Sequence, residues 1–158
     1  MNANRSRPIR FLLNGESVSA ATQPNETLLL LLRDKLHAWE VKNGCSHGDC
    51  GSCAVIINGQ VRLACLVLSH QVEGAEVVTV RGLGDADHPH PLQEAFVAHG
   101  ASQCGFCSPG MLITAKSLLD QNPHATREEI REALSGNLCR CTGYQKIVDA
   151  VEAVARSH

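Results

Sequence analysis

Short apolar segments that end in a two-residue turn dominate the first part of the chain. Residues 9–13 alternate weakly between apolar and polar positions and lead into an Asn-Gly pair at 14–15. Residues 54–57 are apolar and mostly β-branched, and they lead into a second Asn-Gly pair at 58–59. Because Asn-Gly readily supplies the positive φ angles of a two-residue turn, the pattern predicts two β-hairpins, the second returning along residues 61–66.

Between and after the hairpins, the pattern predicts one helix and one further strand. Residues 26–36 are rich in leucine and have good helix propensity. Residues 77–80 form a short, mostly β-branched run. The resulting order of strand, strand, helix, loop, strand, strand and strand is typical of a small α+β domain whose sheet packs on one helix.

The pattern changes at residues 82–91, where glycine, aspartate and proline crowd together without periodicity, as is typical of a linker. Every later segment has a helical pattern. Residues 92–99 form one predicted helix, and residues 109–121 form another, with Ser108 as its N-cap and Pro109 at its first position.

Two capping boxes predict the starts of two further helices. In such a box a hydroxyl residue and the glutamate or glutamine three positions later satisfy each other's free backbone N–H groups. Thr126 with Glu129 fits this pattern, and so does Thr142 with Gln145. We therefore predict an α+β chain in three parts: a sheet-containing domain at residues 1–81, a linker at 82–91 and a domain of four short helices at 92–158.

Composition and charge narrow the functional class. The 158 residues are 44% hydrophobic and 19% charged, which is typical of a folded soluble protein. The formal net charge of -2 and the lack of a Lys/Arg run argue against a nucleic-acid partner. The longest apolar run, residues 28–32, is far shorter than the roughly 20 residues of a membrane-spanning helix.

The expected compartment bears on the chemistry of the cysteines. No apolar stretch of signal-peptide length follows the arginines near the start, so we expect a cytoplasmic protein without direct membrane insertion. In a reducing compartment, metal binding or catalysis explains eight cysteines better than structural disulfides do.

The first cysteine set lies in a glycine-rich loop and the hairpin that follows it. Its members are Cys45, Cys50, Cys53 and Cys65. This is the C-x4-C-x2-C…C spacing of plant-type [2Fe–2S] sites. Glycines between the first three cysteines allow the tight backbone that a shared cluster requires, and Cys65 on the return strand would tie the loop to the sheet. The interval to Cys65 is shorter than in plant ferredoxins, which points to a relative of those proteins.

The second cysteine set lies among the predicted helices. Its members are Cys104, Cys107, Cys139 and Cys141. Each pair comes just before a predicted helix start, so we expect the four thiolates to converge where two helix N-termini meet. Helix N-termini carry partial positive charge and free N–H groups, which stabilise thiolates and the anionic cluster they form. The sequence therefore predicts a second [2Fe–2S] cluster.

Other readings of the cysteines remain open. Four thiolates satisfy tetrahedral zinc as readily as iron, and this alternative is stronger for the second set than for the first. A thioredoxin-like pair of Cys104 and Cys107 needs a βαβ setting and leaves Cys139 and Cys141 without a role. Disulfides would require an oxidising compartment.

Four motifs together resemble the small iron–sulfur subunit of the molybdenum hydroxylase, or xanthine oxidase, family. They are Gly44-Cys45, Gly48-Asp-Cys50-Gly-Ser-Cys53, Gln103-Cys-Gly-Phe-Cys-Ser-Pro-Gly-Met111 and Gly136-Asn-Leu-Cys-Arg-Cys-Thr-Gly-Tyr144. The resemblance covers nearly the whole chain, with Ser52 and Ser108 as slight departures that keep a small side chain. It implies an N-terminal β-grasp, plant-type ferredoxin-like domain and a C-terminal four-helix domain, each with one cluster.

The resemblance also implies a role and partners. The chain would relay electrons from a molybdenum centre in a large molybdopterin-binding subunit, through two [2Fe–2S] clusters, to FAD in a medium subunit or to another acceptor. The heterotrimer is often paired into a dimer. Gln103 would hydrogen-bond the pterin, Cys141 would be the cluster ligand nearest to it, and no residue of this chain would catalyse the substrate reaction. The alternatives are a free-standing ferredoxin-type electron carrier and a zinc-stabilised binding module.

Overall fold

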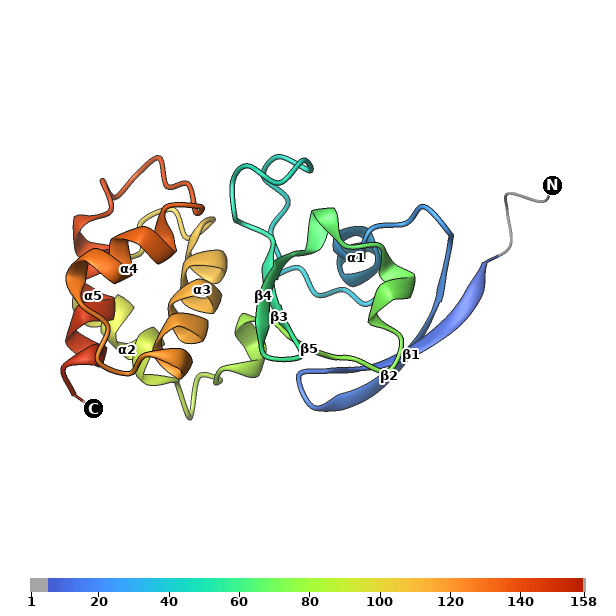
Figure 1. Ribbon diagram of the computed structural model, residues 1–158, viewed down its shortest axis with the longest axis horizontal. Coiled ribbons are helices and arrows are strands. Elements are labelled where there is room, and N and C mark those ends of the chain that lie inside the picture. The colour runs from blue at the N-terminus through green and yellow to red at the C-terminus, as the bar shows by residue number, and fades with distance from the viewer. Residues whose placement is uncertain (1–5, 158) are drawn as a thin grey trace.

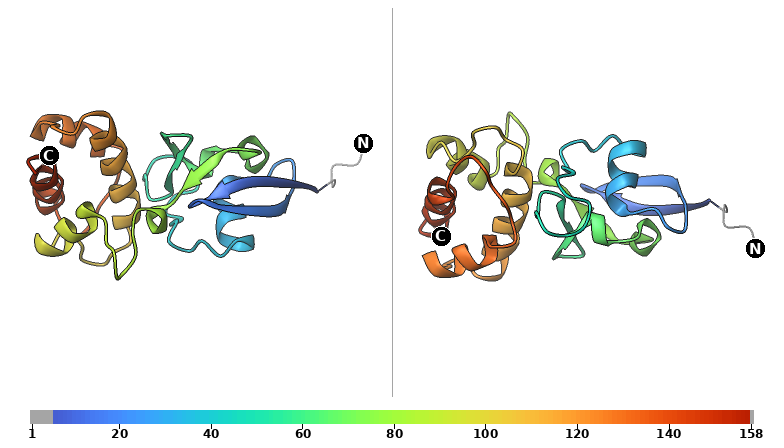
Figure 2. Two further views of the ribbon diagram at one scale, coloured as in Figure 1. Left: turned by 90° about the horizontal axis from the view of Figure 1, so that it is seen from below. Right: turned by 90° about the horizontal axis from the view of Figure 1, so that it is seen from above.

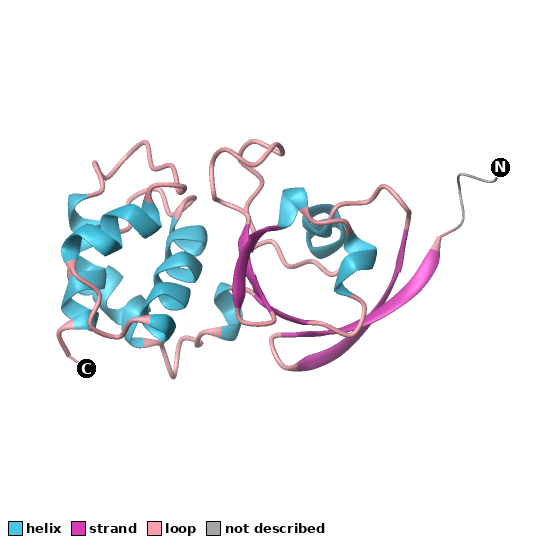
Figure 3. Cartoon of the chain, in the orientation of Figure 1, coloured by secondary structure: helices cyan, strands magenta, loops and turns pink. Residues whose placement is uncertain are grey.

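The computed structural model describes residues 6–157 of the chain. Its fold is α+β, as predicted: a five-stranded mixed sheet comes first, and longer helices follow. Figure 1 shows the sheet with the short helix α1 on the N-terminal side and helices α2 to α5 on the C-terminal side. The cartoon coloured by secondary structure shows the same separation of strands from the longer helices (Figure 3).

Two antiparallel hairpins and one later strand build the sheet. The strands are β1 (Arg7–Leu13), β2 (Glu16–Thr22), β3 (Ala54–Ile57), β4 (Gln60–Leu63) and β5 (Glu76–Val78). Their order is β2-β1-β5-β3-β4, so the last strand lies between the two hairpins and pairs in parallel with β1. Both predicted Asn-Gly turns are confirmed, since all four of their residues have positive φ angles.

One face of the sheet is covered by a leucine-rich turn of helix. Ile9 and Phe11 alternate with exposed residues along β1 and are buried. They pack in one cluster with leucines of α1 (Leu28–Leu30) and of the π-helical turn Leu31–Lys35. Burying a large apolar side chain stabilises a fold by about 1.5–3 kcal/mol, so this cluster holds the first part of the chain together.

Helix and strand ends in this region differ from the predictions. The helix expected at 26–36 begins after Thr27, whose Oγ1 accepts a hydrogen bond from the Leu30 N–H at 3.3 Å. The return strand was predicted too long: β4 ends at Leu63, and Cys65 lies in the 3₁₀ turn Ala64–Leu66. The chain turns there because the Ala64 N–H bonds the Cys53 carbonyl, which leads Cys65 into the core.

A second buried cluster lies among the later helices. These are α2 (Pro91–Ala98), α3 (Ser108–Gln121), α4 (Arg127–Leu134) and α5 (Gln145–Ala155). Their fully buried side chains include Leu92, Met111, Ile130 and Ile147. In the part of the chain that the structure describes, no helix has the length and apolar character needed to cross a membrane.

One predicted helix cap is confirmed and two are wrong. Thr126 and Glu129 form the expected capping box at the start of α4. Ser108 is already the first residue of α3, and Cys107 occupies the N-cap position. The second capping box does not form, because Tyr144 precedes α5 with a left-handed φ of 67° and makes no side-chain cap.

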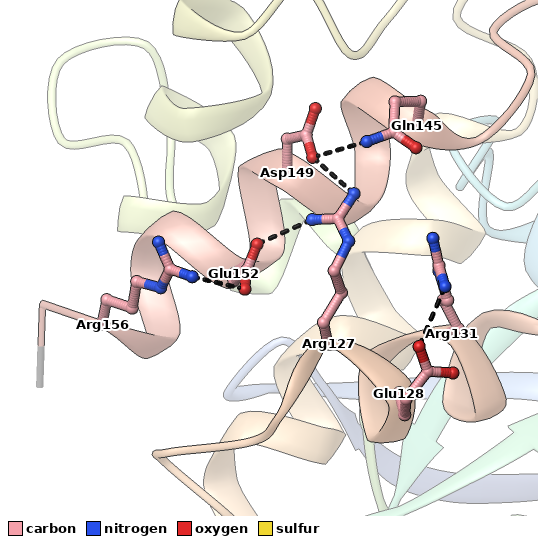
Figure 4. Close-up of polar contacts among 7 residues, drawn as sticks. All are labelled: Arg127, Glu128, Arg131, Gln145, Asp149, Glu152 and Arg156. Carbon is pink, nitrogen blue, oxygen red and sulfur yellow. Dashed lines mark hydrogen bonds and ion pairs between the residues drawn. The ribbon is translucent and has the colours of Figure 1, made fainter.

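An ion-pair network joins α4 to α5. The Arg127 guanidinium lies 2.7 Å from both Asp149 and Glu152, and Arg156 binds the other oxygen of Glu152 (Figure 4). The hydrogen bond to Asp149, followed by that to Glu152, raises the pKa of Arg127. The network fixes how these two helices lie together, and the loop between them carries Cys139 and Cys141.

Helix α3 also joins the helices to the sheet. Ile113 of α3 is fully buried against Ala54 and Ile56 of β3. Both views in Figure 2 show α3 at the boundary between the two regions. The start of α3 therefore lies close to the loop that precedes β3, and this contact brings the two cysteine sets near each other.

Candidate metal centres

The first cysteine set is carried by an irregular loop and the turn that faces it. Cys45 and Cys50 lie in the loop, Cys53 immediately precedes β3, and Cys65 lies in the 3₁₀ turn after β4. Gly48 and Gly51 have φ angles of 94° and 69°, which residues with a Cβ rarely adopt. These two glycines let the loop curl so that sulfur atoms from different segments approach one another.

Two thiol pairs result, with opposite electrostatics. The backbone N–H of His47 lowers the pKa of Cys45 to about 6, helped against some burial by hydrogen bonds from Cys50. Burial raises the pKa of the Cys53 thiol to about 12, and the side chain of Cys65 beside it adds to the rise. Cys45 therefore loses its proton more readily than an ordinary cysteine, while Cys53 needs a cation beside it to do so.

The second cysteine set joins the start of α3 to the loop between α4 and α5. The sulfur atoms of Cys104 and Cys141 are 3.6 Å apart, and both residues are exposed. Cys107 and Cys139 form the inner pair and are partly buried. Burial raises the pKa of Cys107 to about 12, with the neighbouring Cys139 contributing. The structure thus brings Cys104 next to Cys141 and Cys107 next to Cys139, and the binding of one cluster by all four stays a prediction.

Cys139 is prepared for metal binding by its neighbours. Burial disfavours its thiolate, but the hydroxyl and the backbone N–H of Thr142 outweigh burial and lower the pKa to about 7. The Thr142 Oγ1 lies 3.1 Å from the sulfur, and its N–H lies 3.4 Å away. The same oxygen also accepts a hydrogen bond of 3.1 Å from the Tyr144 N–H, so Thr142 supports both the cysteine and the turn that leads into α5.

Tyr144 is a site residue that the sequence analysis missed. Its hydroxyl accepts a hydrogen bond of 2.8 Å from the Cys139 N–H, and its ring packs against the helical core. The signal lay in the Thr-Gly-Tyr run after Cys141: Gly143 and Tyr144 both have positive φ, so this run is a tight turn and not the start of a helix.

The contacts join the eight sulfur atoms two by two. The pairs are Cys45 with Cys50, Cys53 with Cys65, Cys104 with Cys141 and Cys107 with Cys139. Within residues 6–157 no group of three or more His, Cys, Asp or Glu side chains lies close enough together to hold a metal ion. A [2Fe–2S] cluster takes two thiolates on each iron. The pairs fit the cluster.

Comparisons with known proteins agree with this geometry. A family model described as "2Fe-2S iron-sulfur cluster binding domain" matches residues 18–93, and one described as "[2Fe-2S] binding domain" matches residues 79–152. The nicotinate dehydrogenase small FeS subunit of Eubacterium barkeri is 50% identical over 143 residues, which are 90% of this chain and 91% of that one. This chain belongs to the small iron–sulfur subunits of the molybdenum hydroxylase family.

Other members of the molybdenum hydroxylase family are also similar to this chain. The aldehyde oxidoreductase iron-sulfur-binding subunit of Escherichia coli K12 is 38% identical over 163 residues, covering 94% of this chain and 71% of that one. The crystal structure of quinoline 2-oxidoreductase from Pseudomonas putida 86 contains a chain with a TM-score of 0.93 and 42% identity, covering 98% of this chain and 96% of that one. As an iron–sulfur subunit of this family, the protein transfers electrons within a multi-subunit oxidoreductase.

Proposed function

We propose that the two cysteine sets hold one [2Fe–2S] cluster each and relay electrons between redox centres held by two partner subunits. The first cluster would be bound by Cys45, Cys50, Cys53 and Cys65, and the second by Cys104, Cys107, Cys139 and Cys141. The observation that carries this proposal is the pairing of sulfur atoms at both places, which matches two irons per cluster. A bound cluster supplies a reversible one-electron couple.

We assign each cluster to its own domain. Residues 1–81 form a β-grasp domain, residues 82–91 a linker and residues 92–158 a four-helix domain. The two large buried clusters support this division, one under the sheet and one among the helices, while a small third cluster joins β3 to α3. The parallel pairing of β1 with the late strand β5, beside a short helix, supports the β-grasp assignment.

The exposed edge of the second set would face the large subunit and its molybdopterin. Cys104 and Cys141 are both exposed, and Gln103, also exposed, directly precedes Cys104. We propose that the Gln103 amide hydrogen-bonds the pterin and that Cys141 is the ligand nearest to it. Thr142 and Tyr144 would hold the Cys139 side of the loop while the outer pair meets the partner.

The exposed edge of the first set would face the electron acceptor. The exposed side chains of His47 and Asp49 lie 2.9 Å apart in the loop, and Leu66, 63% exposed, follows Cys65. We propose a medium subunit with FAD on this side, a heterotrimer that pairs into a dimer, and a cytoplasmic location. Relatives are named for nicotinate and quinoline, so an N-heteroaromatic compound is our proposed substrate class for the whole enzyme.

Purification of the complex with its native partners tests the proposal. We expect a red-brown preparation that contains molybdenum and two irons per cluster, and two distinguishable S = 1/2 EPR signals after reduction with dithionite. Stoichiometric zinc with half the expected iron would show that one set is a zinc site. Recovery of the chain without any partner would favour a free-standing carrier.

Single substitutions test the grouping of ligands. Cys50→Ala should abolish one EPR signal and leave the other, and Cys107→Ala should do the reverse, because the two residues belong to different sets. Loss of both signals from either substitution, in a complex that still assembles, would contradict the assignment of separate clusters to the two sets.

A further inference from the structure

The two cysteine loops touch through backbone groups, although they are far apart in sequence. The Leu138 N–H donates a hydrogen bond of 2.9 Å to the Cys50 carbonyl. Beside it, the Asn137 side-chain Nδ2 donates a bond of 3.1 Å to the Gly51 carbonyl, across 86 positions of the chain. Cys50 belongs to the first cysteine set, and Leu138 immediately precedes Cys139 of the second.

The Asn137 amide is buried at this contact. The residue is only 4% exposed, and a buried amide is costly unless it is hydrogen-bonded. Its backbone N–H bonds the Leu134 carbonyl and finishes α4, so the backbone and the side chain have separate tasks. Removing the side chain would therefore leave the helix end intact and break the bond across the two loops.

Two glycines allow the approach. A Cβ on Gly51 would lie 2.5 Å from the Gly136 carbonyl oxygen and 2.6 Å from Asn137 Nδ2. A Cβ on Gly110, in the first turn of α3, would lie inside van der Waals contact of the Gly51 carbonyl oxygen. Three segments thus meet backbone to backbone, and any side chain at either glycine would separate them.

We infer that Asn137 is a positioning residue that fixes the separation of the two clusters. The inference rests on the proposed assignment of one cluster to each cysteine set. With the loops held together, a short path runs from Cys50 through its carbonyl and the Leu138 N–H to Cys139. In the transfer one cluster loses an electron and the other gains it, and no bond forms or breaks. The contact between Asn137 and Gly51 therefore controls the distance between the two clusters.

Substitution of Asn137 in the assembled complex tests the inference. In Asn137→Ala we expect both EPR signals at full intensity, a smaller magnetic splitting between the two reduced clusters, because the coupling weakens with distance, and slower electron transfer between them. Hydrogen–deuterium exchange at the Leu138 amide should accelerate about fivefold, because one buried hydrogen bond that resists opening has been removed. Asn122→Ala, which removes the bond from Asn122 to Glu129 at the far end of α3, is the matched control and should change none of these three readouts.

Gly110→Ala provides an independent test of the same contact. Alanine favours the helix more than glycine does, so the added methyl group acts mainly by displacing Gly51. It should reduce the same splitting while Asn137 and all eight cysteines keep their identity, although the new methyl group also approaches Asn137 Nδ2 to 3.2 Å. In the unsubstituted complex, the Leu138 amide should exchange as slowly as the helical core, and this can be measured whether or not the variants fold.

The outcomes separate this inference from the proposed function. Unchanged splitting in Asn137→Ala or Gly110→Ala with both signals present would overturn the inference alone, and so would rapid exchange of the Leu138 amide in the unsubstituted complex. Loss of the second signal in Asn137→Ala would also overturn it, because Asn137 would then build the site. A single signal in the unsubstituted complex would overturn the two-cluster proposal itself.

Discussion

Thr142 shows how one residue can tune a cysteine and support the following turn at the same time. Its hydroxyl and N–H both approach the Cys139 sulfur and lower the pKa of that thiol to about 7, against the effect of burial. The same donors would stabilise the extra negative charge of a reduced cluster, because hydrogen bonds to cluster sulfurs raise the reduction potential. We therefore expect the potential of the proposed second cluster to depend on this residue.

A conservative pair of substitutions measures that dependence. Thr142→Val keeps the shape of the side chain and removes the hydroxyl, so the potential of the second cluster should fall by on the order of 50 mV, about one hydrogen bond for a one-electron couple. Thr142→Ser, which keeps the hydroxyl, should retain the original value. EPR-monitored redox titration of the complex reads both clusters at once. A fall of equal size in both potentials would contradict a local effect of Thr142.

At the same scale, the eight cysteines could be found from the sequence and several of their supporting residues could not. The spacing of the cysteines is local, and the structure brings all eight side chains into pairs. Tyr144 and Asn137 act through contacts that depend on turns and on packing between distant segments. No rule of local spacing predicts that an asparagine will bond a glycine 86 positions away.

Among the elements, α4 is the helix whose start matches its sequence signal most closely. The Thr126 hydroxyl faces the Glu129 N–H at 3.4 Å, and the Glu129 carboxylate accepts from the Thr126 N–H at 2.7 Å. These bonds, led by the backbone N–H of Thr126, lower the pKa of Glu129. Arg127, in the same turn, then reaches α5, so the cap helps to hold the loop of the second cysteine set.

Loss of this cap should lower stability without removing a cluster. Thr126→Ala should cost about 1 kcal/mol, since the hydroxyl satisfies a free N–H of the first turn. For a chain of this size the loss corresponds to a fall of roughly 2–4 °C in Tm, measured by thermal unfolding of the complex. Thr126→Ser should keep the original Tm. An unchanged Tm in Thr126→Ala would show that the capping box does not contribute.

At other element boundaries, tertiary contacts override the structure that the local sequence predicts. The capping box at Thr142 was predicted on the same rule as that at Thr126, but its hydroxyl bonds Cys139 and the next two residues turn left-handed. The strand predicted at 61–66 was shortened because Ala64 and Cys65 are drawn into the core. In both cases contacts made by a cysteine set replace the regular helix or strand that the local sequence predicts. The hairpin turns contain no cysteine, and both were predicted correctly.

Over the whole molecule, the two cysteine sets differ in what they expose. In the second set, Cys104 and Cys141 are exposed and Gln103 lies beside them on the surface. In the first, Cys53 and Cys65 are buried in the core of the sheet region. Electrons must enter and leave the subunit at its surface. The exposed pair of Cys104 and Cys141, with Gln103 beside it, is therefore the better candidate for the contact with the pterin.

Substitution of Gln103 tests that contact. If the amide holds the pterin, Gln103→Ala should slow reduction of the second cluster by substrate about tenfold, the effect of losing an outer contact at a metal site, while both EPR signals survive. If Gln103 is only a surface residue, stability changes by at most about 0.5 kcal/mol and the rate stays the same. Stopped-flow reduction of the molybdenum-loaded complex distinguishes the two. Gln121→Ala, which changes an exposed glutamine at the other end of α3, should leave the rate unchanged. An unaltered rate in Gln103→Ala would remove the pterin contact from the proposal and leave the cluster assignments standing.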